Sequence, residues 1–294
     1  MSVNTTETSI RHAQLLRESR PFIHALHGQT VVVGFLGATL SDLSMRLQWM
    51  QDIALLALLG ARPLLVHGVP WSGHAEQPSP AAQRAAMTEV NVDLVRLLNR
   101  EGARAVGLNG QDAHWALASD QNEQGLLDAD TALIQALLAG GMIPALMACA
   151  PDVNEAWHSL PSERFAAQVA QRLQARALVL VSEEAPSLWA GMSDGMMDRR
   201  GAATWLAAHE RDESALAMRA AMAAADGGVS TVHWVDAHGQ GGLIAELLTS
   251  EGEGAVLCRR GSTQVLNDTA RYFSHADSVI RPNFVAEHKW VVRF

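Results

Sequence analysis

Lysine is almost absent from this sequence of 294 residues. Of its 22 basic residues only Lys289 is a lysine, and all the others are arginines. Chemistry that needs two ammonium groups in one site is therefore excluded for this chain acting alone. Cysteine is also scarce, because only Cys149 and Cys258 are present, far apart and within apolar runs. This pattern predicts two buried thiols in a reducing cytoplasm rather than a disulfide framework.

Excess positive charge is missing as well. The 31 acidic residues outnumber the basic ones and give a formal net charge of −9, so we expect no nucleic-acid partner. No segment has the pattern of a secretory signal or a membrane-spanning helix, so we expect no membrane partner and a cytoplasmic protein. The 48% of apolar residues and 18% of charged residues are typical of a globular protein with a sizeable core.

Short apolar runs alternate with amphipathic segments along the chain. The spacing predicts strands at 30–36, 62–67, 104–108, 143–148, 176–181, 231–235 and 255–259. It predicts helices at 9–26, with an interruption at Pro21, and at 43–59, 80–100, 131–139, 163–175, 214–225 and 242–249. This alternation predicts an α/β fold whose mostly parallel central sheet is sandwiched between helices. Residues 71–80 are rich in proline, serine, glycine and histidine, and residues 183–211 mix one proline and three glycines with methionine and tryptophan. We expect loops or lids in both stretches.

Eight motifs lie within these predicted elements and at their ends. In chain order they are Phe22–Val33, Gln51–Gly60, Pro63–Gly68, Val90–Asn91, Ala105–Asp112, Gly141–Pro144, Val232–Asp236 and Leu243–Gly254. Together they resemble the amino acid kinase family, and within it N-acetylglutamate kinase and the kinase-like domain of N-acetylglutamate synthase. The resemblance implies a three-layer αβα sandwich. It also implies an N-terminal helical extension at 1–28, a kinase-like domain at 29–260 with lobes of about 29–150 and 151–260, and a C-terminal extension at 261–294.

Active members of that family transfer phosphate from Mg-ATP to a carboxylate, and lysines and glycine amides neutralise the moving charge. By the resemblance, the two catalytic lysines fall on Gly34 and Ala217, and the phosphate-binding glycine triplet is replaced by Gly68-Val69-Pro70. The resemblance therefore implies a kinase-inactive protein with no certain cofactor. The alternative is a divergent kinase that uses Mg-ATP, with Glu163 and Arg219 as its catalytic residues.

The resemblance also assigns a ligand and its contacts. The implied ligand is arginine or an acylated amino acid, and the implied function is a regulatory or partner subunit in arginine-related metabolism. The contacts carried over are Gly37, His67, Gly68, Asn109, Ser159, Glu251, Gly252 and Gly254. The last three would hold arginine beside an N-terminal helix, but Glu251 could equally cap a turn while the helix covers the sheet.

Three further expectations concern partners, metals and aromatic residues. The resemblance implies a homo-oligomer, either a dimer or a hexamer, and allows an acetyltransferase or a kinase paralogue as a partner. We expect no metal site, because the histidines lack zinc-ligand spacing. Five tryptophans near predicted element ends fill space that nucleotide would occupy in an active kinase, or else line a ligand pocket: Trp71, Trp115, Trp157, Trp189 and Trp205.

Overall fold

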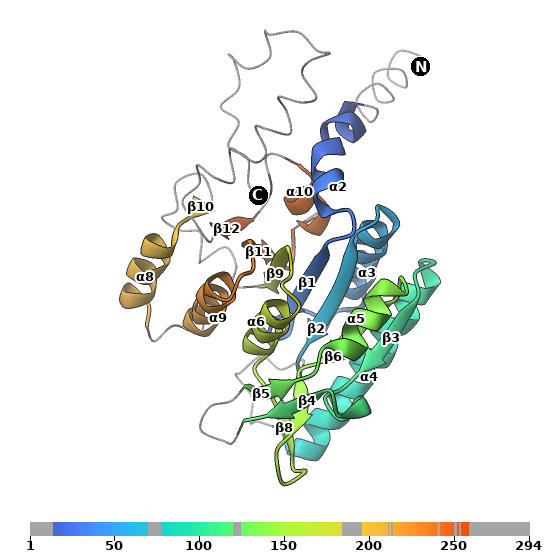
Figure 1. The fold of residues 1–294 in the computed structure, drawn as a ribbon, viewed down its shortest axis with the longest axis vertical. Helices are drawn as coiled ribbons and strands as arrows, with labels where there is room; N and C mark the ends of the chain where they lie inside the picture. The colour runs from blue at the N-terminus through green and yellow to red at the C-terminus, as the bar shows by residue number, and fades with distance from the viewer. Residues whose placement is uncertain are drawn as a thin grey trace.

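An eight-stranded sheet forms the centre of the molecule (Figure 1). The computed structural model describes residues 14–69, 78–119, 125–183, 196–210, 212, 214–239, 242–249, 252 and 254–258. The strand order is β10–β12–β11–β9–β1–β2–β6–β3, and every neighbouring pair is parallel except β11 and β12. The strands are β1 (Thr30–Phe35), β2 (Arg62–His67), β3 (Ala105–Leu108), β6 (Ile143–Met147), β9 (Ala177–Ser182), β10 (Met196–Met197), β11 (Thr231–Asp236) and β12 (Ala255–Cys258).

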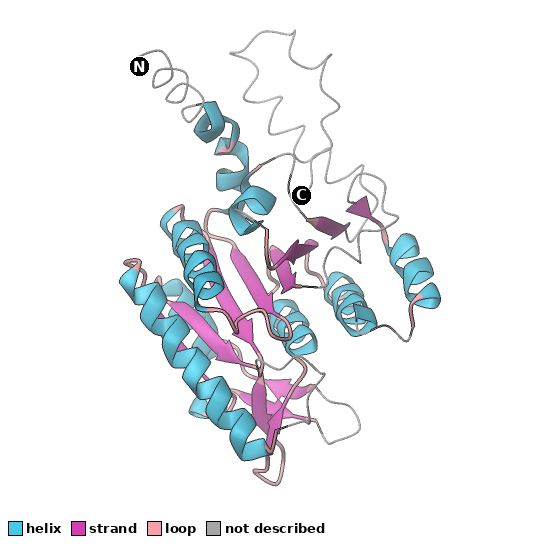
Figure 2. Ribbon diagram, turned by 180° about the vertical axis from the view of Figure 1, so that it is seen from behind, coloured by secondary structure: helices cyan, strands magenta, loops and turns pink. Residues whose placement is uncertain are grey.

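Helices cover both faces of this sheet, as Figure 2 shows from behind. One face packs against α2 (Arg20–Leu26), α3 (Leu43–Leu58), α4 (Pro80–Arg100) and α10 (Gly242–Leu248). The other face packs against α5 (Ala132–Ala139), α6 (Ser162–Arg172), α8 (Arg199–Ala208) and α9 (Ser214–Asp226). Successive residues of β1 alternate between the two cores: Val31 and Val33 lie in the first and Val32 in the second. The predicted three-layer αβα sandwich with a mostly parallel sheet is confirmed.

Helix starts follow the local chemistry of the sequence. Asp42 caps α3 by accepting hydrogen bonds from the backbone N–H groups of Ser44 and Met45. The interruption predicted at Pro21 within 9–26 lies at Ser19: residues 14–18 are helical, Ser19 forms a turn, and α2 then begins with Pro21 in its first turn. Proline is tolerated there because the first turn needs no intrahelical N–H donor.

The structure differs from the sequence expectation in three places. Two small hairpins were not predicted, namely β4 (Ala116–Ala118) with β5 (Leu126–Ala129), and β7 (Cys149–Pro151) with β8 (Trp157–Ser159). The loop prediction for 183–211 is wrong for residues 196–208, which form β10 and α8. Asp198 starts α8 by accepting a hydrogen bond from the backbone N–H of Gly201. Residues 70–77, 184–195 and 259–294, which carry the rest of the predicted lids and the C-terminal extension, lie outside the described residues.

Cys149 is a buried thiol, as predicted, and burial raises its pKa to about 11. Its side chain is therefore an inert part of the core at neutral pH. The side chain of Cys258 lies outside the described residues. Within the described residues, every helix is too short or too polar to cross a lipid bilayer.

Candidate functional site

The carboxyl ends of the parallel strands bring most of the predicted ligand-binding residues to one edge of the sheet. Gly37 follows β1, Gly68 follows β2 and Asn109 follows β3. Ser159 ends β8, and this hairpin is attached to the same edge because the Ala148 N–H donates to the carbonyl of His67 over 2.8 Å. Clefts outside the carboxyl ends of parallel strands are where open α/β sheets bind ligands. We call this region the sheet-edge site.

The first turn of α6 lies directly against this edge. A Cβ atom on Gly68 would lie 3.3 Å from the Cβ of Ser162, so the end of β2 and the start of α6 are in contact. Glu163 follows at once, and the Ser162 hydroxyl donates to its Oε2 over 3.3 Å. Burial raises the pKa of Glu163 above its ordinary value. The structure therefore places one predicted catalytic residue at the sheet-edge site.

Arg219, the other predicted catalytic residue, lies on α9 with a half-exposed side chain. Its guanidinium lies 3.9 Å from the carboxylate of Glu210 on the surface. Among the described residues this carboxylate is its ion-pair partner, and Glu163 is not. The catalytic roles of Glu163 and Arg219 remain predictions of the divergent-kinase alternative.

The position that the resemblance assigns to the first catalytic lysine is closed. Gly34 is buried in β1, and a Cβ atom there would lie 2.9 Å from the Cβ of Ala166 and 3.3 Å from Cδ2 of Leu180. Contacts under 3.0 Å between side-chain carbons require neighbouring atoms to move. The second lysine position, Ala217, is also buried. The sequence's one lysine, Lys289, lies outside the described residues.

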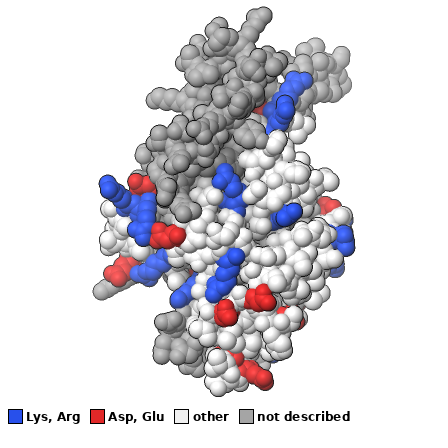
Figure 3. Space-filling view, viewed as in Figure 1, with Lys and Arg blue, Asp and Glu red and all other residues white. Residues whose placement is uncertain are grey.

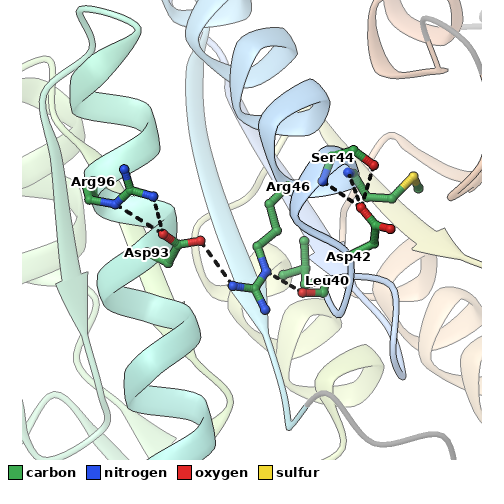
Figure 4. Close-up of polar contacts among 7 residues, drawn as sticks. Leu40, Asp42, Ser44, Arg46, Asp93 and Arg96 are labelled. Carbon is green, nitrogen blue, oxygen red and sulfur yellow. Dashed lines mark hydrogen bonds and ion pairs between the residues drawn. The ribbon is translucent and has the colours of Figure 1, made fainter.

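A chain of polar contacts fixes the loop between β1 and α3, which carries Gly37 (Figure 4). Arg46 on α3 donates from Nε to the carbonyl of Leu40 and from Nη1 to Asp93 Oδ2 on α4, the latter over 3.1 Å. Arg96 binds the other oxygen of Asp93 at 2.6 Å. Burial acts to raise the pKa of Asp93, but the hydrogen bonds from Arg96 and Arg46 hold it below its ordinary value. The loop is therefore tied to both helices.

The loop after β3 is held by its own side chains. Asn109 Oδ1 accepts a hydrogen bond from the N–H of Gln111, and Asp112 Oδ2 accepts one from the N–H of Asn109. Arg84 on α4 donates to the side chain of Gln111 over 2.8 Å. Trp115 donates from Nε1 to the carbonyl of Asn109 and packs edge-on against a buried phenylalanine. Trp115 thus fills space beneath this loop.

His67 and Asn91 form a buried polar pair beneath the sheet-edge site. Their exposed fractions are 1% and 4%. Asn91 Nδ2 lies 3.0 Å from His67 Nε2 and 2.9 Å from the carbonyl oxygen of Ala145 on β6. Burial lowers the pKa of His67 to about 4, so the imidazole is neutral at pH 7. Sequence reasoning named His67 as a ligand contact, but its side chain is directed to the protein interior.

A second polar pair lies at the other predicted site, near the end of α10. Glu246 is fully buried and lies 2.7 Å from Nδ1 of His233, while its Oε2 accepts the N–H of Gly254 over 2.7 Å. Thr249 Oγ1 accepts the N–H of Gly252 over 3.2 Å. The turn after α10 is therefore anchored at both of its described glycines, and α2 packs against α10. Glu251 lies outside the described residues.

The Glu246–His233 pair was not predicted from the sequence, although the sequence contains one signal of it. Glu246 interrupts the apolar run Leu243–Leu248 of a short helix, and a carboxylate in such a run indicates a buried partner.

Charge and metal chemistry add little to the two sites. On the face in Figure 3, arginine side chains are scattered among acidic and uncharged ones and form no continuous stripe. The described residues hold no group of three or more histidine, cysteine or carboxylate side chains arranged to bind a metal. The expectation that nucleic acid is not a partner stays a prediction.

Comparison with known proteins places this fold in a family. The model of the amino acid kinase family matches residues 29–185, and the chain belongs to that family. The chain is 25% identical to the acetylglutamate kinase of Gracilaria tenuistipitata var. liui, across 85% of this chain and 98% of that enzyme. It is 26% identical to the acetylglutamate kinase of Chromobacterium violaceum, across 83% of this chain and 96% of the relative.

Solved structures agree on the fold. The N-acetylglutamate synthase of Neisseria gonorrhoeae, complexed with coenzyme A and L-arginine, matches 84% of this chain with a TM-score of 0.69 at 22% identity. This chain spans 65% of the synthase's length. An isopentenyl phosphate kinase matches 78% of this chain and 99% of its own with a TM-score of 0.55 at 16% identity. At these identities the likeness concerns the amino acid kinase fold alone.

Proposed function

We propose that this protein is a kinase-inactive, acetylglutamate-kinase-like protein that binds arginine or an acylated amino acid. It acts as a regulatory or partner subunit in arginine-related amino acid metabolism. The observation that carries the proposal is the closed position of Gly34, where Ala166 occupies the space that a lysine side chain would need. Without that cation, and with no lysine among the described residues, none of the described side chains offers an ammonium group to the charge on a moving phosphoryl group.

Two observations support the ligand class. The turn after α10 is anchored through Glu246 and Thr249, and α2 packs beside this helix. The synthase with the matching fold was solved in complex with L-arginine, which makes arginine the first ligand to test. If Mg-ATP is bound at all, the amides after β2 and Glu163 at the start of α6 are the groups at the sheet edge that would meet it.

Calorimetric titration of the purified full chain tests this function. We expect L-arginine or N-acetyl-L-glutamate to bind without nucleotide, and D-arginine serves as the stereochemical control. A ligand at 100 times its dissociation constant should stabilise the protein by about 2.7 kcal/mol. A parallel assay for ADP release with Mg-ATP and N-acetyl-L-glutamate should give no turnover. Turnover that depends on Glu163 and Arg219 would contradict the proposal and establish the divergent kinase.

The outer face of α4 supports a homodimer. Six exposed residues form a nearly flat patch on this face: Ala81, Arg84, Ala85, Thr88, Glu89 and Val92. Val92 is 63% exposed there. A second copy that crosses antiparallel midway between Ala85 and Thr88 would place Arg84 opposite Glu89 of the partner subunit, and the two-fold axis would repeat this pair. Small residues at the crossing allow the helices to approach closely.

Light scattering after size exclusion tests the α4 face. We expect the wild type to be an even-numbered oligomer and Ala85→Arg to halve its mass, because a guanidinium at the crossing point would be buried without a partner. Ala203→Arg, at an exposed position of α8, is the matched control and should keep the wild-type mass. A monomeric wild type, or an Ala85→Arg variant of unchanged mass, would contradict this interface. Association with an acetyltransferase or a kinase paralogue would then remain to be sought.

A further inference from the structure

We propose that Asn91 is a positioning residue for the sheet-edge site, which acts through His67 to aim the backbone N–H of Val69 toward a bound ligand. The proposal rests on the proposed function in one respect, namely that the ligand carries a carboxylate or carbonyl oxygen. The structural basis is a series of hydrogen bonds that runs from α4 to the end of β2.

The orientation of the Asn91 amide follows from one contact. The carbonyl oxygen of Ala145 can only accept a hydrogen bond, so the Asn91 atom that lies 2.9 Å from it must be the amide nitrogen. That nitrogen carries two hydrogens and accepts none. Its second hydrogen therefore points to His67 Nε2, which lies 3.0 Å away.

The tautomer of His67 follows in turn. Because Nε2 must accept from Asn91, the proton of the neutral imidazole resides on Nδ1. That N–H then donates to the carbonyl oxygen of Gly68, which lies 3.2 Å from Nδ1. Protonation of Nε2 would bring two donors face to face, which adds to burial as a reason for the neutral ring. In this series, the direction of each hydrogen bond is thus determined by the one before it.

The last step sets the direction of the backbone N–H of Val69. In a trans peptide the C=O of one residue and the N–H of the next point in opposite directions. The Gly68 carbonyl is turned toward His67, so the N–H of Val69 points away from it. Among the described residues this N–H has no hydrogen-bond partner. Pro70 follows and has no N–H, so Val69 carries the last backbone donor before that proline.

Gly107 on β3 shows how tightly Asn91 is held. A Cβ atom at Gly107 would lie 1.9 Å from Asn91 Oδ1, so only glycine leaves room for this amide. Asn91 therefore spans three neighbouring strands, β2, β6 and β3, from its place on α4. A side chain in that position responds little to solvent and sets the relative placement of the strand ends.

Nitrogen NMR of the histidine rings tests the inference without a ligand. We expect the His67 ring to show the Nδ1–H tautomer and to remain neutral until the pH falls toward its pKa of about 4, with the signal assigned by its loss in His67→Gln. In Asn91→Asp, the carboxylate would accept from Nε2, so the ring should gain a proton there and titrate at higher pH. An Nε2–H tautomer in the wild type would overturn the proposal.

Binding provides the second readout. Asn91→Asp should weaken the binding of N-acetyl-L-glutamate about tenfold, whereas Asn99→Asp, at the exposed end of the same helix, should bind like the wild type. Asn99 is a matched control because its Oδ1 acts as an acceptor for the Ala105 N–H, a role that aspartate keeps. Unchanged binding in Asn91→Asp would refute the positioning role. Failure of the wild type to bind would count against the proposed function. The tautomer of the His67 ring would still test the hydrogen bonds from Asn91 through His67. If Asn91→Asp does not fold, Gly107→Ala displaces the same amide and should shift the His67 signals.

Discussion

Replacing Glu246 by alanine is expected to destabilise the protein by about 3 kcal/mol, measured by urea unfolding at neutral pH. The carboxylate is fully buried and serves both His233 Nδ1 and the Gly254 N–H, each over 2.7 Å. Its removal takes the acceptor from two donors that water cannot reach, and leaving buried donors unsatisfied costs about 1–3 kcal/mol each. The turn that follows α10 should lose the most order, because the Gly254 N–H is bound there by Glu246.

Two further variants separate charge from hydrogen bonding at this pair. Glu246→Gln keeps one acceptor oxygen but turns an NH₂ group toward the other donor, so we expect an intermediate loss of stability. Glu210→Ala removes a mostly exposed carboxylate that lies 3.9 Å from Arg219, and its free energy of unfolding should stay within about 0.5 kcal/mol of the wild type. A Glu246→Ala variant as stable as Glu210→Ala would show that the buried pair contributes little.

Restoring a lysine at position 34 is expected to damage the protein rather than revive a kinase. In Gly34→Lys the new Cβ would lie 2.9 Å from the Ala166 Cβ. The lysine side chain would also have to extend from a buried strand that lies between two packed cores. Overpacking costs about 1–3 kcal/mol and an unpaired buried charge adds several more. We expect a destabilisation of about 4 kcal/mol and no phosphorylation of N-acetyl-L-glutamate by Mg-ATP.

Gly37→Lys is the matched control for that variant, since it introduces the same side chain three residues later. No atom lies within 4 Å of a Cβ built at Gly37, so the side chain has room. The positive φ of 55° costs a non-glycine residue about 1 kcal/mol, which sets the expected loss. Wild-type stability in Gly34→Lys would show that α6 can move to make room for the side chain. Phosphoryl transfer by this variant would show that the missing cation is the main reason for the lack of kinase activity.

Most of the regular elements could be predicted from the sequence because their hydrophobic spacing is long and unbroken. The predicted bounds of β2 and α4 agree with the structure, since Arg62 and Pro80 start them clearly. The hairpins β4–β5 and β7–β8 were missed because strands of three or four residues are too short to show alternation. Helix α8 was missed because the glycine, methionine and tryptophan residues in this stretch favoured a loop prediction, although Asp198 is a regular N-cap.

The candidate sites could be predicted only at the level of the backbone. The family resemblance assigns Gly37 and Gly68, and both follow strands whose carboxyl ends share one edge of the sheet. The partners of buried polar side chains do not follow. Asn91 and His67 are 24 residues apart, and Glu246 and Gly254 meet only once the turn after α10 has formed. Such contacts depend on tertiary packing that no local pattern encodes.

The two cores of the sandwich differ in the side chains that build them, and this has a consequence for how the protein tolerates substitution. Where α6 meets α9, the buried residues are mainly alanines, among them Ala166, Ala170, Ala221 and Ala224. Where α3 and α4 cover the sheet, they are large, among them Met50, Ile53, Leu94 and Leu97. Added atoms are therefore the main hazard on the α6–α9 side, and removed atoms are the main hazard on the α3–α4 side. Among random substitutions of buried residues, we therefore expect larger side chains to be tolerated least on the α6–α9 side and smaller side chains to be tolerated least on the α3–α4 side.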